Sequence, residues 1–115
     1  MRPLVSLVMM IKDEAKSLRG VLEAVKPFVD RWTIVDTGSR DNSCRIVKEV
    51  MEGVPGWLHH EDFKGYAATR NRVLDLDAQV TDPSEFSLFL SGDEYLRDGA
   101  KLREYLETQR STDVD

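Results

Sequence analysis

The chain has 115 residues, of which 41% are hydrophobic and 32% charged, and its formal net charge is -5. This composition is typical of one soluble globular domain and excludes a disordered chain. The acidic balance argues against a broad nucleic-acid-binding surface, which is normally basic. No apolar run reaches the ~20 residues that a membrane-spanning helix needs.

The apolar start of the chain, residues 1–11, resembles a signal peptide only superficially. It is short, lacks a small-residue cleavage site and is closed by the charged residues Lys12, Asp13 and Glu14. The single cysteine, Cys44, cannot form an intramolecular disulfide, and we interpret it as a small packing side chain near a helix start. We therefore expect a soluble, cytoplasmic protein.

The first half of the chain predicts two strands that alternate with two helices. Residues 4–11 are almost continuously apolar, as in a strand covered on both faces, and residues 32–35 are rich in β-branched and aromatic side chains. Apolar residues then recur with helical spacing, from Ala15 onward and again after a turn at residues 36–43. The side chains predicted to face the core from these helices are Leu18, Val21, Leu22, Val25, Phe28, Val29, Ile46, Val47, Val50 and Met51.

The second half continues the alternation. Residues 57–60 predict a weaker third strand, and residues 86–90 predict a fourth. In the third strand His59 and His60 are adjacent, so they point to opposite faces and do not easily share a metal ion; we interpret both as edge-strand residues. Trp32 and Trp57 are interpreted as core or edge packing.

Two further helices are predicted in this half. The third covers residues 66–76, and Asp98 can cap the last one. We expect one domain over residues 1–110 and a mobile tail over residues 111–115. The side chains predicted to pack from these helices are Ala67, Ala68, Val73, Leu74, Leu102, Tyr105 and Leu106.

Strands that alternate with helices predict an α/β fold. Right-handed crossovers place such strands in a mostly parallel sheet with helices on both faces, a Rossmann-like three-layer sandwich. We expect the strand order 3-2-1-4. The chain reverses direction across the sheet between strands 1 and 4, and open α/β sheets bind ligands beside such a reversal, at the carboxyl ends of the strands.

Acidic side chains follow three of the four predicted strands. Asp13 and Glu14 follow the first strand, Asp36 the second and Asp93 the fourth, so all would lie at one edge of the sheet. Ionised groups beside a core must be paired or bound to a metal. Oxygen ligands suit Mg²⁺ or Mn²⁺, which Asp93 would hold against a diphosphate, with Arg70 as a second positive contact.

Two common phosphate-binding motifs are missing from the sequence. It has no G-x-G-x-x-G after the first strand, which argues against a dinucleotide, and no P-loop, which excludes that class of NTPase. A receiver-type aspartate phosphoacceptor domain would place its reactive acid at Asp36. It would also need a lysine at the end of a late strand, and none is visible there.

Each of these charged residues also has a simpler structural interpretation. Asp13 and Glu14 are consistent with acids at a helix start, where they match the helix dipole. Asp36 is consistent with a turn cap, the acids after the fourth strand with a solvated turn, and Arg70 with a surface side chain of its helix.

Four sequence blocks together carry a resemblance to a known family. They are VSLVMMIKDE at residues 5–14, IVDTGSRD at 34–41, ATRN at 68–71 and LFLSGDE at 88–94. In this order and spacing they resemble family-2 glycosyltransferases of the GT-A fold, the subset with V-K-N-E, V-D-T-G-S-x-D, A-R-N and F-L-D-A-D-E. The resemblance covers nearly the whole chain to about residue 96.

The resemblance implies a nucleotide site at the first two blocks. Lys12, Asp13 and Glu14 would border the nucleotide base, and Asp36 would hydrogen-bond it, with Ser39 in the turn beside it. The expected ligand is a nucleotide-diphosphate sugar, bound with a divalent cation (Mn²⁺ or Mg²⁺) for transfer to an unknown acceptor.

The last two blocks imply the diphosphate and metal contacts. Arg70, with Asn71 behind it, would approach the base or the diphosphate, and Asp93 matches the last acid of the family's DxD and would ligate the metal. The first acid of that motif is Ser91 here, which can hydrogen-bond a ribose hydroxyl but brings no charge. We therefore expect a reduced metal affinity.

The chain ends soon after the fourth block. The half of the family fold that carries the acceptor site and the catalytic base of inverting members has no counterpart here, so no general base can be assigned. A non-catalytic or truncated module that binds nucleotide or a protein partner is the alternative function. An uncovered fourth strand can pair with another copy, so we expect a homodimer, a swapped assembly or a larger parent protein.

Overall fold

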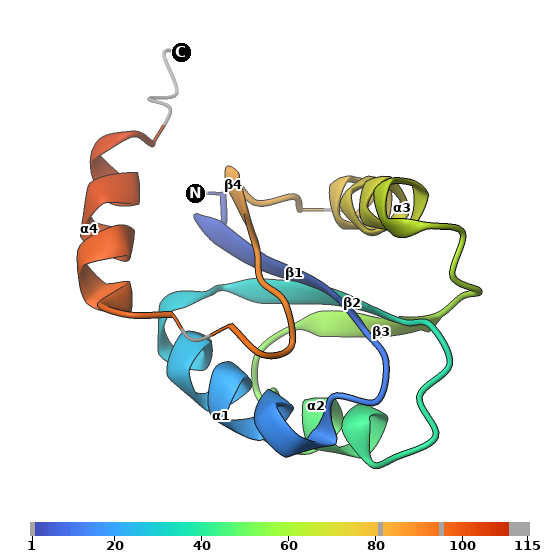
Figure 1. Ribbon diagram of the computed structural model, residues 1–115. Helices are drawn as coiled ribbons and strands as arrows, with labels where there is room; N and C mark the ends of the chain where they lie inside the picture. The colour runs from blue at the N-terminus through green and yellow to red at the C-terminus, as the bar shows by residue number, and fades with distance from the viewer. Residues whose placement is uncertain (1, 81, 95, 111–115) are drawn as a thin grey trace.

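A computed structural model describes residues 2–80, 82–94 and 96–110, and in these residues strands and helices alternate along the chain (Figure 1). The predicted mobile tail, residues 111–115, lies outside the described residues. The elements are β1 (Val5–Ile11), α1 (Ala15–Val25), a 3₁₀ turn η1 (Lys26–Phe28), β2 (Arg31–Asp36), α2 (Ser43–Val50), β3 (Gly56–His60), α3 (Tyr66–Ala78), β4 (Phe86–Phe89) and α4 (Gly99–Thr108).

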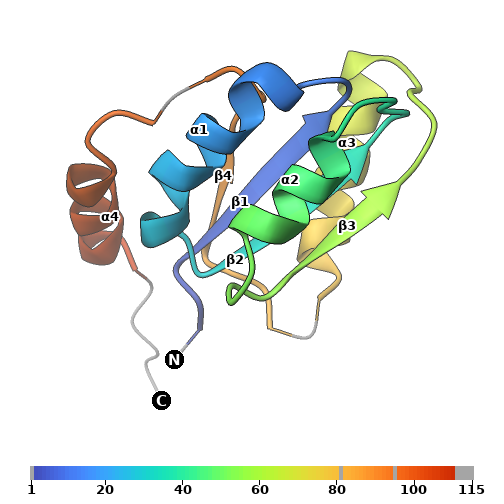
Figure 2. The ribbon, with the colours of Figure 1, turned by 90° about the horizontal axis from the view of Figure 1, so that it is seen from below.

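The four strands form one sheet in the order β3-β2-β1-β4, as predicted. All neighbouring strands are parallel, so their carboxyl ends lie at the same edge, which we call the carboxyl edge (Figure 2). Helices α1 and α2 cover one face of the sheet and α3 covers the other (Figure 1). The predicted Rossmann-like three-layer sandwich is therefore confirmed.

The main core lies between the sheet and the helices α1 and α2. It includes the alternate β1 side chains Leu7, Met9 and Ile11, which are buried because helices cover that face. All the predicted core residues of α1 and α2 are buried except Phe28, which is half-buried in η1. A Cβ atom on Gly99 would lie 2.3 Å from the Phe28 ring, so the start of α4 can approach η1 only because residue 99 is glycine.

The second core, on the α3 face, is smaller. Its buried residues are Val8, Val35 and Val73, with Leu74 packed against them. Ala67 and Ala68, predicted to pack, are exposed. This prediction was wrong because the apolar residues of α3 do not form one continuous stripe, and the buried side of the helix is formed by Thr69, Val73 and Asp77.

A buried carboxylate also holds α3 to the sheet. Asp77 is 4% exposed and accepts hydrogen bonds from the hydroxyls of Ser6 in β1, Thr33 in β2 (2.8 Å) and Ser87 in β4 (3.1 Å). The Nε atom of Arg31 lies 3.8 Å from the same carboxylate. One side chain thus joins three strands, which satisfies polar groups that would otherwise be costly to bury.

Helix α4 lies beside the sheet near η1 (Figure 1). Asp98 caps it as predicted, because its carboxylate accepts a hydrogen bond from the Lys101 N–H. Leu102 is half-buried and Leu106 packs against the main core, but Tyr105 is 61% exposed, so its predicted packing was wrong. Trp57 on the edge strand β3 is likewise 66% exposed.

No helix among the described residues is long and apolar enough to cross a membrane. At the other side of the sheet β4 pairs only with β1 among the described strands. The association expected from this open edge stays a prediction.

Candidate functional site

The loops that follow β1 and β2 are joined by hydrogen bonds at the carboxyl edge. The Asp13 N–H donates to Ser39 Oγ (2.9 Å), and the Asp13 carboxylate accepts from the Arg40 N–H (2.6 Å). Asp13 has a left-handed backbone, with φ of 52°, which is uncommon outside glycine but tolerated by aspartate. Asp13 and Ser39, both predicted site residues, therefore fix the loops to each other.

Another acid in these loops, Asp41, fixes the starts of two helices. Its carboxylate accepts hydrogen bonds from the N–H groups of Ala15 (3.1 Å) and Ser43 (2.9 Å). The Ser43 hydroxyl accepts in turn from the Glu14 N–H (2.8 Å). Hydrogen bonds, the largest from the Ser43 side chain, lower the pKa of Asp41. Glu14 is the N-cap residue of α1, but its carboxylate makes no capping hydrogen bond.

Asp36 ends β2 and is only 5% exposed. Burial alone would raise its pKa, but hydrogen bonds from Ser39, Gly38 and the Cys44 thiol outweigh burial and lower the pKa. Its carboxylate accepts from the backbone N–H groups of Gly38 (3.2 Å) and Ser39 (3.1 Å). Asp36 is thus an ionised group that shapes the turn, as the simpler interpretation expected, and it also borders a cavity.

Two adjoining cavities open at the carboxyl edge, and Thr37 borders both. Lys12 and Glu14 line the smaller cavity, and Asp36 lines the larger. The smaller, about 310 Å³, is lined by Met10, Ile11, Lys12, Glu14, Thr37 and Phe63. The larger, about 430 Å³, is lined by Asp36, Thr37, Gly38, His60, Glu61, Asp62 and Lys64.

The turn after β4 leaves one carboxylate free. Glu94 accepts a hydrogen bond from the Ser91 N–H (2.8 Å), and the Glu94 N–H donates to the Ser91 carbonyl (3.1 Å), which closes the turn. Hydrogen bonds from Ser91 accordingly lower the pKa of Glu94. Asp93, between them, is exposed and has no hydrogen-bond or ion-pair partner in the described part of the chain.

Asp93 and Glu14 lie close enough to repel each other. Burial raises the pKa of Glu14, and the negative charges of Asp93 and then Asp41 raise it further. Gly92 allows this approach, since a Cβ atom there would lie 2.3 Å from Glu14 Oε2. The Ser17 hydroxyl also donates to the Gly92 carbonyl (2.7 Å), which ties the turn to α1. Two neighbouring carboxylates form a donor set suited to a hard divalent cation.

Arg70 reaches the same edge from the α3 face. Its guanidinium lies 5.4 Å from the centre of the Phe89 ring at the end of β4, and it has no ion-pair partner among the described residues. Neither Arg70 nor Asn71 lines the cavities. The structure therefore brings Lys12, Glu14, Asp36 and Asp93 to one edge of the sheet and places Arg70 beside the last strand.

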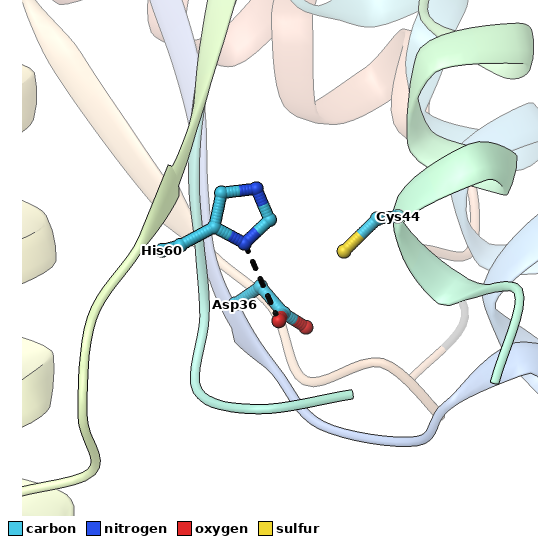
Figure 3. Close-up of side chains that lie close together, drawn as sticks. All are labelled: Asp36, Cys44 and His60. Atoms are coloured by element: carbon cyan, nitrogen blue, oxygen red, sulfur yellow. Dashed lines mark ion pairs between the residues drawn. The ribbon is translucent and has the colours of Figure 1, made fainter. Parts of the chain in front are cut away.

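Two residues at this edge were missed from the sequence. Cys44 was interpreted as packing and His60 as an edge-strand residue, yet both lie beside Asp36 (Figure 3). The signal that could have found His60 is the β2–β3 register, which pairs it with Asp36.

The sequence comparison yields one curated relative and no family. No family model matches the chain. The "TPR repeat-containing protein Synpcc7942_0270" from Synechococcus elongatus is 36% identical over 92 residues. This match covers 80% of the chain but 21% of the relative, so the chain spans about a fifth of that protein's length.

Solved structures match the fold more completely. S. aureus TarS matches with a TM-score of 0.69 and 19% identity over 92% of this chain and 31% of TarS. TarS in complex with UDP matches with a TM-score of 0.67 and 18% identity, over 89% of this chain and 31% of that one.

A third solved structure matches less closely. Glucosyl-3-phosphoglycerate synthase from Mycobacterium tuberculosis, in complex with Mn²⁺, UDP and glucosyl-3-phosphoglycerate, has a TM-score of 0.54 and 16% identity. The match covers 78% of this chain and 33% of the synthase, so the chain spans about a third of the solved proteins. The chain thus has the fold of GT-A-type glycosyltransferases, which the sequence motifs predicted.

Proposed function

We propose that this chain binds a nucleotide-diphosphate sugar together with a divalent cation, as the donor-binding part of a glycosyltransferase. The observation that carries the proposal is the repulsion between two carboxylates at the carboxyl edge: that of Glu14, which lines the smaller cavity with Lys12, and that of Asp93. The fold adds support, because solved proteins that share it are in complex with UDP, one of them also with Mn²⁺.

The proposed metal ligands are Asp93 and Glu14. The sequence motifs assigned only Asp93 to the metal and placed Glu14 at the nucleotide base. A cation between the two carboxylates would offset the repulsion that raises the pKa of Glu14. The ion, Mn²⁺ or Mg²⁺, would neutralise charge that develops on the departing diphosphate.

The proposed nucleotide contacts lie along the same edge. The ionised Asp36 accepts a hydrogen bond from the base, and Lys12, exposed and without an ion-pair partner among the described residues, meets negative charge on the ligand. Asp13 and Ser39 act indirectly, because their side chains join the two loops that border the cavities. Arg70, which also lacks an ion-pair partner there, approaches the diphosphate from the α3 face.

Calorimetry of UDP binding in the presence of Mn²⁺ tests this proposal. We expect saturable heat for the unchanged chain and none for Asp93→Ala, because the variant removes a metal ligand. Glu52→Ala is the matched control: it removes an exposed acid that follows α2 and makes no described contact. If neither UDP nor any other nucleoside diphosphate binds in the presence of Mn²⁺, the proposal is wrong.

A binding-only module is the second candidate function. Ser91 at the position of a family acid favours it. The two functions differ in turnover. Slow, Mn²⁺-dependent release of free sugar from a bound donor supports a competent transferase site, whereas nucleotide binding without any release supports the module.

A further inference from the structure

Three side chains with different metal-binding atoms converge beside the larger cavity. Asp36 ends β2, His60 ends β3 and Cys44 is the second residue of α2. Their ligand atoms, a carboxylate oxygen, a ring nitrogen and a thiol sulfur, all lie within 4.8 Å of one another. Figure 3 shows the imidazole and the thiol reaching towards the Asp36 carboxylate from β3 and α2.

The backbone explains why these residues meet. Asp36 and His60 are register partners on neighbouring parallel strands, so their side chains leave the same face of the sheet. Helix α2 covers that face and begins with Ser43, whose N–H is held by Asp41. The first turn of α2, with Cys44, is thereby fixed near the end of β2.

The separations fit a tetrahedral metal after small side-chain movements. With bonds of about 2.0–2.3 Å to zinc, tetrahedral ligand atoms lie about 3.3–3.7 Å apart. His60 Nδ1 is already 3.6 Å from Asp36 Oδ2. The remaining separations must close by about 1.5 Å at most. The imidazole can move, since the His60 side chain is 63% exposed.

A nucleophilic thiol is the competing interpretation of this cluster, and the arrangement argues against it. Activation would need a base that accepts the thiol proton, or a nearby positive charge. His60 is the base in this cluster, but its Nδ1 lies 3.6 Å from Asp36 Oδ2, and the Cys44 thiol donates its hydrogen bond to Asp36. Cys44 instead lies beside the ionised Asp36; burial raises the pKa of its thiol, and the Asp36 charge and hydrogen bond raise it further. A cation would reverse this effect by stabilising the thiolate.

We propose that Asp36, Cys44 and His60 bind Zn²⁺ as a three-ligand site whose fourth position opens towards the larger cavity. Mixed sulfur, nitrogen and oxygen ligands favour zinc, whereas Mg²⁺ and Mn²⁺ take oxygen ligands like those of Glu14 and Asp93. Three protein ligands with one open position are typical of zinc sites that hold water or a bound molecule. Of the charged residues that line the same cavity, Glu61 is paired with Arg72 at 2.8 Å, whereas Asp62 and Lys64 carry opposite charges.

This site does not depend on the proposed nucleotide binding. Both use the Asp36 carboxylate, so Zn²⁺ there and a nucleotide base would exclude each other. The metal test is therefore done without nucleotide and follows a signal specific to the Cys44 thiolate, which the variant Asp93→Ala should show as the unchanged chain does. That result separates failure of the zinc site from failure of the proposed function.

Titration of the reduced, metal-free chain with Co²⁺, a spectroscopic substitute for zinc, tests the proposal. We expect a near-ultraviolet thiolate-to-cobalt charge-transfer band that saturates at one equivalent and is lost when Zn²⁺ is added. Cys44→Ser should abolish the band. His60→Ala should weaken Co²⁺ binding by more than about tenfold, since even residues outside the ligand set often change affinity by about 10–100-fold.

His59→Ala is the matched control, because His59 is the neighbouring histidine on the opposite face of β3. It should leave the band and the affinity unchanged. Circular dichroism of each variant checks that the fold is retained. No charge-transfer band in the folded, reduced chain would overturn the zinc site, as would a band that survives Cys44→Ser or that depends on His59 rather than His60.

Discussion

The Glu14 and Asp93 carboxylates repel each other, and neither has a cation partner among the described residues. Because the folded pKa of Glu14 is raised, the folded state keeps its proton to higher pH than the unfolded chain does. Stability therefore falls as pH rises from the unfolded value, about 4.3, through the folded one. This loss of stability at neutral pH is typical of functional sites, where residues that bind a ligand often lower the stability of the free protein.

Glu14→Gln should accordingly stabilise the metal-free protein at pH 7. We expect a gain below about 1 kcal/mol, since the pair is partly exposed and screened. The gain should vanish below about pH 4, where the acid is protonated in both states. Thermal unfolding at pH 7 and at low pH measures it.

Two further variants control this measurement. The double variant Glu14→Gln/Asp93→Asn should be little more stable than Glu14→Gln alone, because either substitution removes the repulsion between the two carboxylates. Glu94→Gln should instead lower stability, since the Glu94 carboxylate accepts a hydrogen bond from Ser91. A loss of stability in Glu14→Gln at pH 7 would show that Glu14 has a stabilising partner, contrary to this account.

At the scale of elements, Asp30 holds the start of β1 and helix α4 together. Its carboxylate accepts hydrogen bonds from the N–H groups of Leu4 (2.9 Å) and Val5 (3.0 Å) and from Arg103 Nη1 (3.0 Å). Burial alone would raise the pKa of Asp30, but the Arg103 and backbone hydrogen bonds outweigh it and lower the pKa. Its stabilisation is present above the unfolded pKa and is lost as pH falls through the folded one.

Asp30→Asn should lower the free energy of unfolding by about 2 kcal/mol at pH 7, because it weakens charged hydrogen bonds. The difference should shrink as the pH falls below about 4, the unfolded pKa, because the unfolded carboxyl then binds a proton that the native carboxylate still resists. Urea unfolding at pH 7 and pH 3 measures both values. Glu107→Gln is the control, since Glu107 is a surface partner of Arg103 at 3.7 Å and should matter little. An equal loss at both pH values would contradict the ionic role of Asp30.

The elements themselves were predictable because their signals are local. An almost continuous apolar run predicted β1, and β-branched and aromatic residues predicted β2. Helical spacing predicted the buried sides of α1 and α2. Contacts between elements were harder to predict. The meeting of Cys44 with His60 depends on the β2–β3 register and on where α2 begins, and the exposure of Tyr105 depends on how α4 lies against η1.

The sequence predicted at which edge of the sheet the candidate site lies, but it did not predict the contacts among the side chains there. The strand order placed the acids together, but which acids are free depends on the loops. The carboxylates of Asp13, Asp41 and Glu94 accept hydrogen bonds from backbone N–H groups, whereas the Asp93 carboxylate accepts none from the described residues. The pairing of Glu14 with Asp93 further requires the close approach of Gly92. None of this follows from residue spacing.

At the scale of the whole molecule, one parallel sheet places every candidate ligand-binding group at one edge, and the match covers about a third of each of the solved chains with this fold. The central claim is that this edge binds a nucleoside diphosphate with a metal at Glu14 and Asp93. The most direct measurement is a crystal soaked with Mn²⁺ and UDP, with anomalous scattering recorded for manganese. This account predicts an anomalous peak within bonding distance of both carboxylates, with the uracil beside Asp36. A peak elsewhere, or UDP bound away from this edge, would contradict it.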